Sequence, residues 1–126
     1  MNDIINKVTD TELDILKVLW NCEQAMTEKE IRAAVNQGWT SGATNRMIIR
    51  LLEKSVLKRE KKDNLFYYLP TITEDEFTKA RTMNFLTKIY GGNAKGLVAT
   101  LLAQDALSEH DIDNLKTYWQ ERKRTR

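Results

Sequence analysis

Residues 40–62 contain side chains whose types and spacing suit the recognition of a nucleic acid. Asn45 and Arg46 lie next to each other on the polar face of a predicted helix. In the major groove of DNA, asparagine pairs with adenine and arginine pairs with guanine. Positions 42–62 hold seven Lys and Arg residues but only two Glu residues, a local charge of +5 in a chain of net charge +2. The segment therefore predicts a surface that reads bases and holds the neighbouring phosphates.

A helix that starts near residue 40 must position these side chains. Thr40 and Ser41 favour a helix start, because short hydroxyl residues accept hydrogen bonds from its free N–H groups. The hydrophobic residues after them have the spacing of a helix with one buried face: Met47, Ile48, Leu51 and Leu52. We expect Asn45 and Arg46 to read bases. Phosphate contacts are expected from the basic residues Arg50, Lys54, Lys61 and Lys62, with Thr40 and Ser41 as donors at the helix start.

A short β-hairpin is predicted to follow this helix. The basic residues 58–62 lead to a turn at Asp63-Asn64, and an aromatic segment, residues 65–69, runs from the turn to Pro70. Two helices, a recognition helix and a charged hairpin in this order are typical of the winged helix-turn-helix. A basic segment alone is also typical of an ordinary solvated surface. The order of the elements is what favours DNA binding.

Length and composition limit the remaining possibilities. The chain has 126 residues, of which 41% are hydrophobic and 30% charged, values typical of a globular protein. No hydrophobic segment approaches the roughly 20 residues that span a bilayer, and the first residues lack the pattern of a signal peptide. The single cysteine, Cys22, excludes an internal disulfide and a multi-cysteine metal site, and we expect it in the core. These features predict a cytoplasmic protein without membrane insertion, metal or cofactor.

Three capping boxes mark helix starts along the chain: Thr9–Glu12, Thr27–Glu30 and Thr73–Glu76. Gly38 is expected to end the second of these helices. The catalytic motifs are missing, since His110 stands alone and neither a phosphate-binding loop nor a nucleophile elbow occurs. The sequence therefore predicts a protein that is not an enzyme. A winged-helix module that binds acidic protein surfaces is the alternative function.

The sequence predicts a division at Pro70 into a winged-helix domain, residues 1–70, and a helical dimerisation domain, residues 71–126. The second part has three amphipathic helices but is too small to bury all its hydrophobic side chains. A second copy would cover them, and a two-fold dimer suits two half-sites roughly 34 Å apart. A compact three-helix cap within one chain is the alternative. The predicted interface residues are Phe85, Leu86, Ile89, Tyr90, Leu97, Val98, Leu101, Leu102 and Trp119.

The chain resembles the penicillinase repressor family, the BlaI/MecI/CopY group of bacterial regulators, over nearly its full length. The resemblance rests on TELDILKVLW at 11–20, WTS and RMIIRLLEK within 39–54, KKDN and FYY within 61–68, and FLTKIYGG and KGLV within 85–98. It implies a mainly helical fold and a homodimer that represses transcription from a palindromic operator in double-stranded DNA. For the β-lactam-responsive members it also implies inactivation by cleavage, through the pathway of a membrane sensor protease.

Two stretches depart from the family pattern. The recognition helix of the family reads close to S-x-K-T-[IV]-x-T, whereas residues 40–46 here read TSGATNR, so Ala43 and Arg46 replace threonines. By this correspondence Ala43 and Thr44 join the predicted DNA-binding residues. The Asn-Phe bond that is cut in the β-lactam repressors aligns with Thr100-Leu101, which is the candidate cleavage site here.

Overall fold

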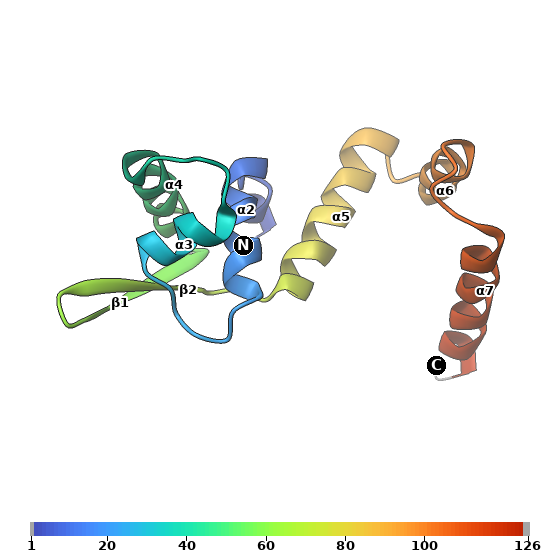
Figure 1. The fold of residues 1–126 in the computed structure, drawn as a ribbon. Coiled ribbons are helices and arrows are strands. Elements are labelled where there is room, and N and C mark those ends of the chain that lie inside the picture. The colour runs from blue at the N-terminus through green and yellow to red at the C-terminus, as the bar shows by residue number, and fades with distance from the viewer. Residues whose placement is uncertain (1, 125–126) are drawn as a thin grey trace. The chain divides into compact units, whose positions relative to one another are not determined.

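The computed structural model describes residues 2–124 and confirms the mainly helical class with one small sheet. In chain order the elements are α1 (Asn2–Ile5), α2 (Asp10–Trp20), α3 (Glu28–Val35), α4 (Ser41–Glu53), β1 (Leu57–Lys62), β2 (Leu65–Pro70), α5 (Glu74–Tyr90), α6 (Ala94–Ala103) and α7 (Glu109–Arg124) (Figure 1). They form two compact units, which divide between Asn84 and Phe85 within α5.

The three predicted capping boxes start α2, α3 and α5. At the first of them, Thr9 Oγ1 accepts a hydrogen bond from the Glu12 N–H at 3.1 Å, and Glu12 Oε1 accepts one from the Thr9 N–H at 3.2 Å. These mutual bonds satisfy two N–H groups that a helix start otherwise leaves free. The end of α3 differs from the prediction: Asn36 adopts the left-handed conformation at φ 53° and closes the helix two residues before Gly38. Asparagine tolerates this conformation better than other side chains do.

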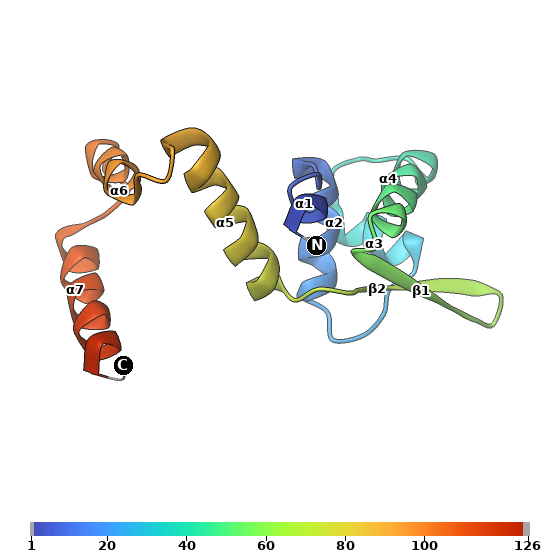
Figure 2. The same cartoon turned by 180° about the vertical axis from the view of Figure 1, so that it is seen from behind.

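The core of the first unit lies among α2, α3, α4 and the base of the hairpin. Its central side chains are fully buried: Ile15, Leu16, Leu19, Ile31, Ile48, Leu51 and Val56. Figure 2 shows α1 on the side of the unit away from the hairpin. The expectation that Cys22 belongs to this core is wrong, because the chain has already left α2 at Trp20 and the Cys22 side chain is exposed.

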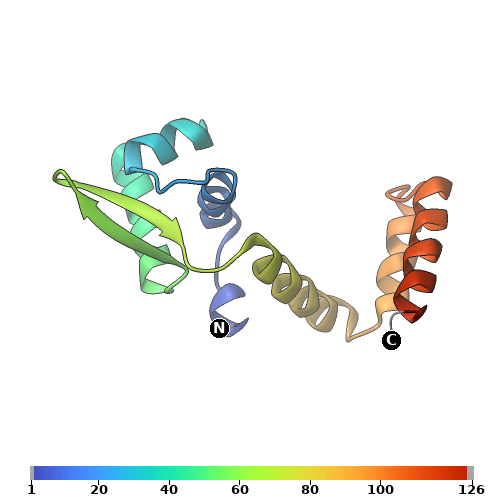
Figure 3. The same cartoon turned by 90° about the horizontal axis from the view of Figure 1, so that it is seen from below.

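The hairpin has the predicted turn. β1 and β2 pair antiparallel from Leu57↔Pro70 to Lys62↔Leu65, and Asp63 and Asn64 connect them with φ of 53° and 65°. Two consecutive positive φ values are those of a type I′ turn, which matches the natural twist of two strands. Two backbone bonds between Met26 and Tyr68, at 2.8 and 3.1 Å, attach β2 to the segment before α3. Figure 3 shows the strands extending from the helices as one arm.

The first compact unit continues past Pro70. Trp20 Nε1 donates to the Ile72 carbonyl at 3.0 Å, and the rings of Trp20 and Phe77 lie 5.5 Å apart. Arg81 Nη1 donates to the Ile5 carbonyl at 3.2 Å. The first turns of α5 therefore belong to the packing of the winged helix. Independent folding of residues 1–70 remains a prediction.

The second unit leaves much hydrophobic surface uncovered. Gly91 and Gly92, with φ of 58° and 85°, end α5, while Asn93 and Ser108 cap α6 and α7. No residue from Phe85 to Arg124 is buried. The exposed large hydrophobic side chains of this unit are Phe85, Ile89, Val98, Leu101, Leu102, Leu115, Tyr118 and Trp119. No described helix is long and hydrophobic enough to cross a membrane.

A charged pair inside the first unit joins the start of α2 to the end of α4. The Glu12 side chain is 1% exposed, and its Oε1 is paired with Lys54 Nζ at the end of α4. Lys54 Nζ also donates to the Lys7 carbonyl at 2.9 Å. The expectation that Lys54 contacts a phosphate is therefore wrong, because a buried carboxylate and a carbonyl already hold its ammonium group.

Lys54→Met should lower the free energy of unfolding by about 2–4 kcal/mol, since it leaves the buried Glu12 carboxylate without its cation. Urea unfolding measures this loss. The matched variant Lys58→Met, on the exposed surface of β1, should change stability by less than about 0.5 kcal/mol. Adding Glu12→Gln to Lys54→Met should restore most of the loss, because the amide oxygen can still accept from the Thr9 N–H. If Lys54→Met and Lys58→Met were equally stable, the pairing of Glu12 with Lys54 would not contribute to stability.

Candidate nucleic-acid interface

Helix α4 presents one polar face to solvent, as the sequence predicts. Met47, Ile48 and Leu51 are buried, whereas the opposite face is exposed: Asn45, Arg46, Ile49 and Arg50. Thr40 caps the helix by accepting from the Ala43 N–H at 3.1 Å. Asn45 and Arg46 therefore lie free on the surface of a helix whose other side is fixed in the core.

Thr44 lies on the wrong side of α4 for a contact with DNA. Its side chain is 0% exposed, and its hydroxyl donates to the Thr40 carbonyl at 2.8 Å. The expectation that Thr44 contacts DNA is therefore wrong. Helical spacing explains the error, since Thr44 precedes Ile48 by four residues and Leu51 by seven, on the same face. Ala43 is half-buried, and its N–H is bonded to Thr40.

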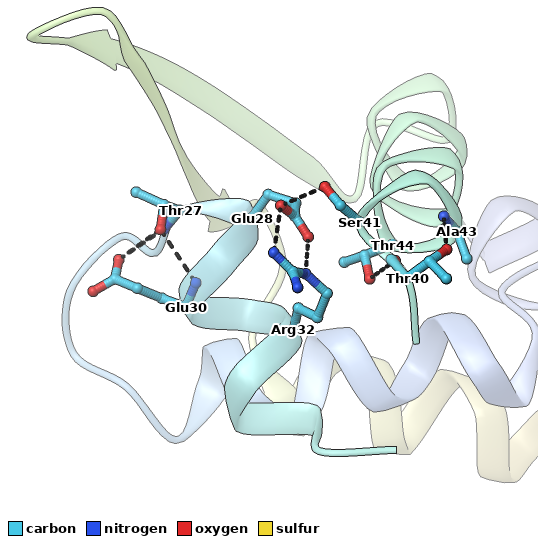
Figure 4. Close-up of polar contacts among 8 residues, drawn as sticks. All are labelled: Thr27, Glu28, Glu30, Arg32, Thr40, Ser41, Ala43 and Thr44. Atoms are coloured by element: carbon cyan, nitrogen blue, oxygen red, sulfur yellow. Dashed lines mark hydrogen bonds and ion pairs between the residues drawn. The ribbon is translucent and has the colours of Figure 1, made fainter. Parts of the chain in front are cut away.

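Ser41 is held by a residue that the sequence analysis missed. Its Oγ donates to Glu28 Oε1 at 3.0 Å, and Glu28 Oε2 pairs with Arg32 Nε at 2.7 Å (Figure 4). Glu28 and Arg32 are an i, i+4 pair, which the sequence shows directly. Their link to Ser41 joins α3 to the start of α4 across 13 residues, and no local pattern indicates it.

The hairpin places its two predicted lysines on opposite faces. Lys61 pairs with Phe66 and Lys62 with Leu65, and neighbouring residues of a strand point to opposite sides. On the Lys61 side, the Arg59 guanidinium lies 4.2 Å from the centre of the Phe66 ring, and Lys61 Nζ lies 5.8 Å from it. Arg59, which is not among the predicted contacts, therefore has a fixed cationic position beside the ring.

A hollow of about 350 Å³ lies where α3, α4 and the hairpin meet. Its lining includes Glu28 and Lys29 from α3, Asn45 from α4, and Phe66 and Tyr68 from β2. Helix α3, helix α4 and the hairpin thus border one concave region of the first unit.

The pKa of Tyr68 is shifted by its surroundings in this hollow. Burial raises the pKa of its phenol above the ordinary value, and the Glu28 carboxylate acts in the same direction. The positive charge of Arg59 opposes both effects on this pKa. Tyr68 therefore stays neutral at physiological pH, and its side chain is a hydrogen-bonding group rather than a charge.

These features define a class of protein. Three helices with a basic hairpin, a recognition helix with a free polar face, and cations on both faces of the hairpin are the parts of a winged helix-turn-helix DNA-binding domain. The sequence matches the penicillinase repressor family over residues 8–121, and the chain belongs to that family. Its fold and family are those of DNA-binding transcriptional repressors and not of enzymes. Among residues 2–124 no three His, Cys, Asp or Glu side chains gather as metal ligands would.

Several bacterial relatives match most of the chain. The penicillinase repressor of Bacillus licheniformis is 28% identical over 94% of each chain. That of Staphylococcus aureus is 27% identical over 87% of this chain and 88% of its own. The methicillin resistance regulatory protein MecI of Staphylococcus aureus is 22% identical over 92% of this chain and 95% of its own.

Solved structures agree with the fold. The solution structure of the DNA-binding domain of the repressor BlaI matches with a TM-score of 0.51 and 27% identity, over 57% of this chain and 89% of that domain. The crystal structure of MepR, a regulator of a Staphylococcus aureus multidrug efflux pump, matches with a TM-score of 0.56 over 94% of this chain and 80% of its own. MepR is 17% identical, so this likeness concerns the fold alone.

Alkaline titration of the folded protein should contain one tyrosine component at higher pH than an ordinary tyrosine, whose pKa is about 10. The ultraviolet absorbance of tyrosinate detects this component. Because the folded pKa of Tyr68 is raised, its neutral phenol contributes stability that is complete below about pH 10 and is lost as pH rises through the folded value. Tyr68→Phe should remove this component, whereas Tyr118→Phe, at an exposed position of α7, should leave it. Survival of the component in Tyr68→Phe would contradict the burial.

Proposed function

We propose that this protein is a homodimeric transcriptional repressor, which binds a palindromic operator with one α4 in the major groove of each half-site. The free polar face of α4 beside a basic hairpin is the observation that carries the proposal. Family membership supports it, since the relatives from Bacillus licheniformis and Staphylococcus aureus include penicillinase repressors. A MepR variant has been solved bound to an oligodeoxyribonucleotide, with a TM-score of 0.54 to this chain.

Within α4, we assign base reading to Asn45 and Arg46. Both side chains are exposed, and neither forms part of the buried face. Arginine presents a planar pair of donors that matches guanine, and asparagine matches adenine in the same way. Arg50, one turn after Arg46, and the hairpin residues Lys61 and Lys62 remain exposed and are assigned to phosphates. Thr40 acts indirectly, because its hydroxyl is the cap that fixes the first turn.

The second unit supplies the proposed dimer interface. Large side chains lie open to solvent there, with exposures of 64% at Ile89 and 60% at Trp119. A hollow of about 430 Å³ between α6 and α7 has a mainly hydrophobic lining that includes Val98, Leu102 and Trp119. Among the other assigned interface residues, Phe85 and Leu101 are exposed, whereas Leu86, Tyr90 and Leu97 are half-buried. A second copy would remove this surface from water, which is the main source of association energy.

Release of the operator is proposed to follow a cut in α6. Thr100 and Leu101 are both exposed, and Thr100 Oγ1 donates to the Gly96 carbonyl at 3.1 Å within the helix. A protease binds an extended strand, so α6 must open locally before it is cut. The resemblance to β-lactam-responsive repressors suggests a membrane sensor protease as the start of the signal. Cleavage here would divide the helix that carries Val98, Leu101 and Leu102.

Arg46→Ala should weaken binding to the selected operator by about 1–3 kcal/mol and remove the preference at one base position. Lys62→Ala should weaken all DNA alike and lower the slope of log affinity against log salt by about one. Fluorescence anisotropy with operator and random DNA at several salt concentrations separates the two effects. If operator and random DNA lose equally in Arg46→Ala, Arg46 is a phosphate contact. If wild type binds no DNA, the proposed function is wrong, and the alternative of an interaction module for acidic protein surfaces takes its place as the hypothesis to test.

Leu101→Asp should make the protein monomeric at about micromolar concentration, because each copy would place an unpaired charge in the hydrophobic interface. Operator affinity should fall steeply, since a monomer loses the gain from joining two half-site contacts. Analytical ultracentrifugation measures the mass. Lys95→Asp, at an exposed polar position of the same helix, should stay dimeric.

A dimeric Leu101→Asp variant would exclude α6 from the interface. The same instrument tests release: protein cut between Thr100 and Leu101 should sediment as a monomer and leave the operator. Cut protein that remains dimeric on DNA would contradict induction by cleavage at this bond.

A further inference from the structure

The Glu28 carboxylate lies at the start of α4 although it belongs to the first turn of α3 (Figure 4). It accepts from Ser41 Oγ at 3.0 Å and pairs with Arg32 Nε at 2.7 Å. The Glu28 side chain is 18% exposed and lines the hollow that Asn45 also borders. A carboxylate that is paired with Arg32 therefore lies beside the first turn of α4, in the lining of this hollow.

The hydrogen bond to Glu28 decides what Ser41 can offer to a ligand. A serine hydroxyl has one proton and two lone pairs, and here the proton is directed at the carboxylate. Ser41 therefore presents lone pairs outward. The carboxylate of Glu28 is itself only an acceptor. Asn45 lies one turn after Ser41 on the same side of α4, so the acceptors stand beside a predicted base reader.

We propose that Glu28 determines operator specificity by positioning the Ser41 hydroxyl as an acceptor, which selects a base with an amino group on its major-groove edge. Adenine and cytosine offer such a donor, through N6 and N4, whereas guanine O6 and thymine O4 accept. The Glu28–Ser41 pair thus favours adenine or cytosine. Because its proton is directed at Glu28, Ser41 acts here as an acceptor and not as the donor to a phosphate that the sequence predicts. This inference rests on the proposed function, because it concerns how the operator is read.

Selection from randomised double-stranded DNA with the full chain tests the inference. Wild type should enrich adenine or cytosine at one position of each half-site. Glu28→Gln should move that preference toward guanine or thymine by about tenfold, because its amide N–H donates to Ser41 Oγ and frees the hydroxyl proton. Ser41→Ala should flatten the preference without creating another. Adding Glu28→Gln to Ser41→Ala should change it no further, since Glu28 acts through Ser41.

A chemical probe isolates the amino group. Replacing the selected base by its analogue without the amino group should weaken wild-type binding about tenfold and leave Ser41→Ala binding unchanged. Equal losses in both proteins would overturn the proposal.

The control is Glu53→Gln, which removes one exposed negative charge at the other end of α4. It should strengthen binding to all DNA without changing the ranking of bases. Thermal unfolding checks that every variant is folded. If Glu28→Gln weakens all sequences alike with the ranking intact, Glu28 only joins α3 to α4 and the inference is wrong. If wild type enriches no sequence, the proposed function itself fails, which is a different result.

Discussion

The buried pair of Glu12 and Lys54 is the constraint on which the geometry of the DNA-binding unit depends. Glu12 accepts from the Thr9 N–H at the start of α2 and pairs with Lys54 at the end of α4. Lys54 in turn reaches the Lys7 carbonyl in the turn after α1. A charge buried this deeply is tolerated only with its partner in place, so the end of α4 has one position against α2. The polar face of α4 is thereby fixed in direction.

The start of α4 is fixed by different chemistry. Thr40 caps its first turn, and Glu28 holds Ser41 from α3. Helix α4 is therefore attached at both ends by carboxylates from two other helices, while hydrophobic packing holds the middle of the helix in the core. A side chain that must meet a base edge within hydrogen-bonding distance requires such a rigid support. The hairpin is attached separately, through the backbone bonds of Met26 and Tyr68.

Much of this fold could be predicted because its signals are local. Capping boxes, the Asp63-Asn64 turn and the hydrophobic spacing of α4 each involve residues a few positions apart, and the structure confirms them. The errors among the expected DNA-binding residues have two causes. Thr44 was included by its place in a family pattern although its helical spacing already places it with Ile48, whereas Lys54 depends on Glu12, 42 residues away. The residues around a lysine in the sequence do not distinguish one that pairs with a distant carboxylate from one that is exposed to solvent.

The candidate site was predicted less completely than the fold for the same reason. Asn45, Arg46 and Arg50 follow from one helix and are exposed as expected. Glu28 and Arg59 were missed because their importance comes from neighbours on other elements, Ser41 in one case and Phe66 across the hairpin in the other. The assigned interface of the second unit remains a prediction, since its side chains are exposed in a single chain.

The alternation of side chains in the hairpin restricts how its charge can evolve. Arg59 and Lys61 share one face with Phe66, and Lys62 lies on the other. Inserting one residue into each strand near the base of the hairpin would turn its outer part over, so that Arg59, Lys61 and Phe66 together would face the other side of the unit. Lengthening each strand by two residues would preserve both faces and extend the arm by roughly 7 Å. Changes in the reach of this arm are therefore expected in steps of two residues per strand, so hairpins of differing length can keep the same two faces.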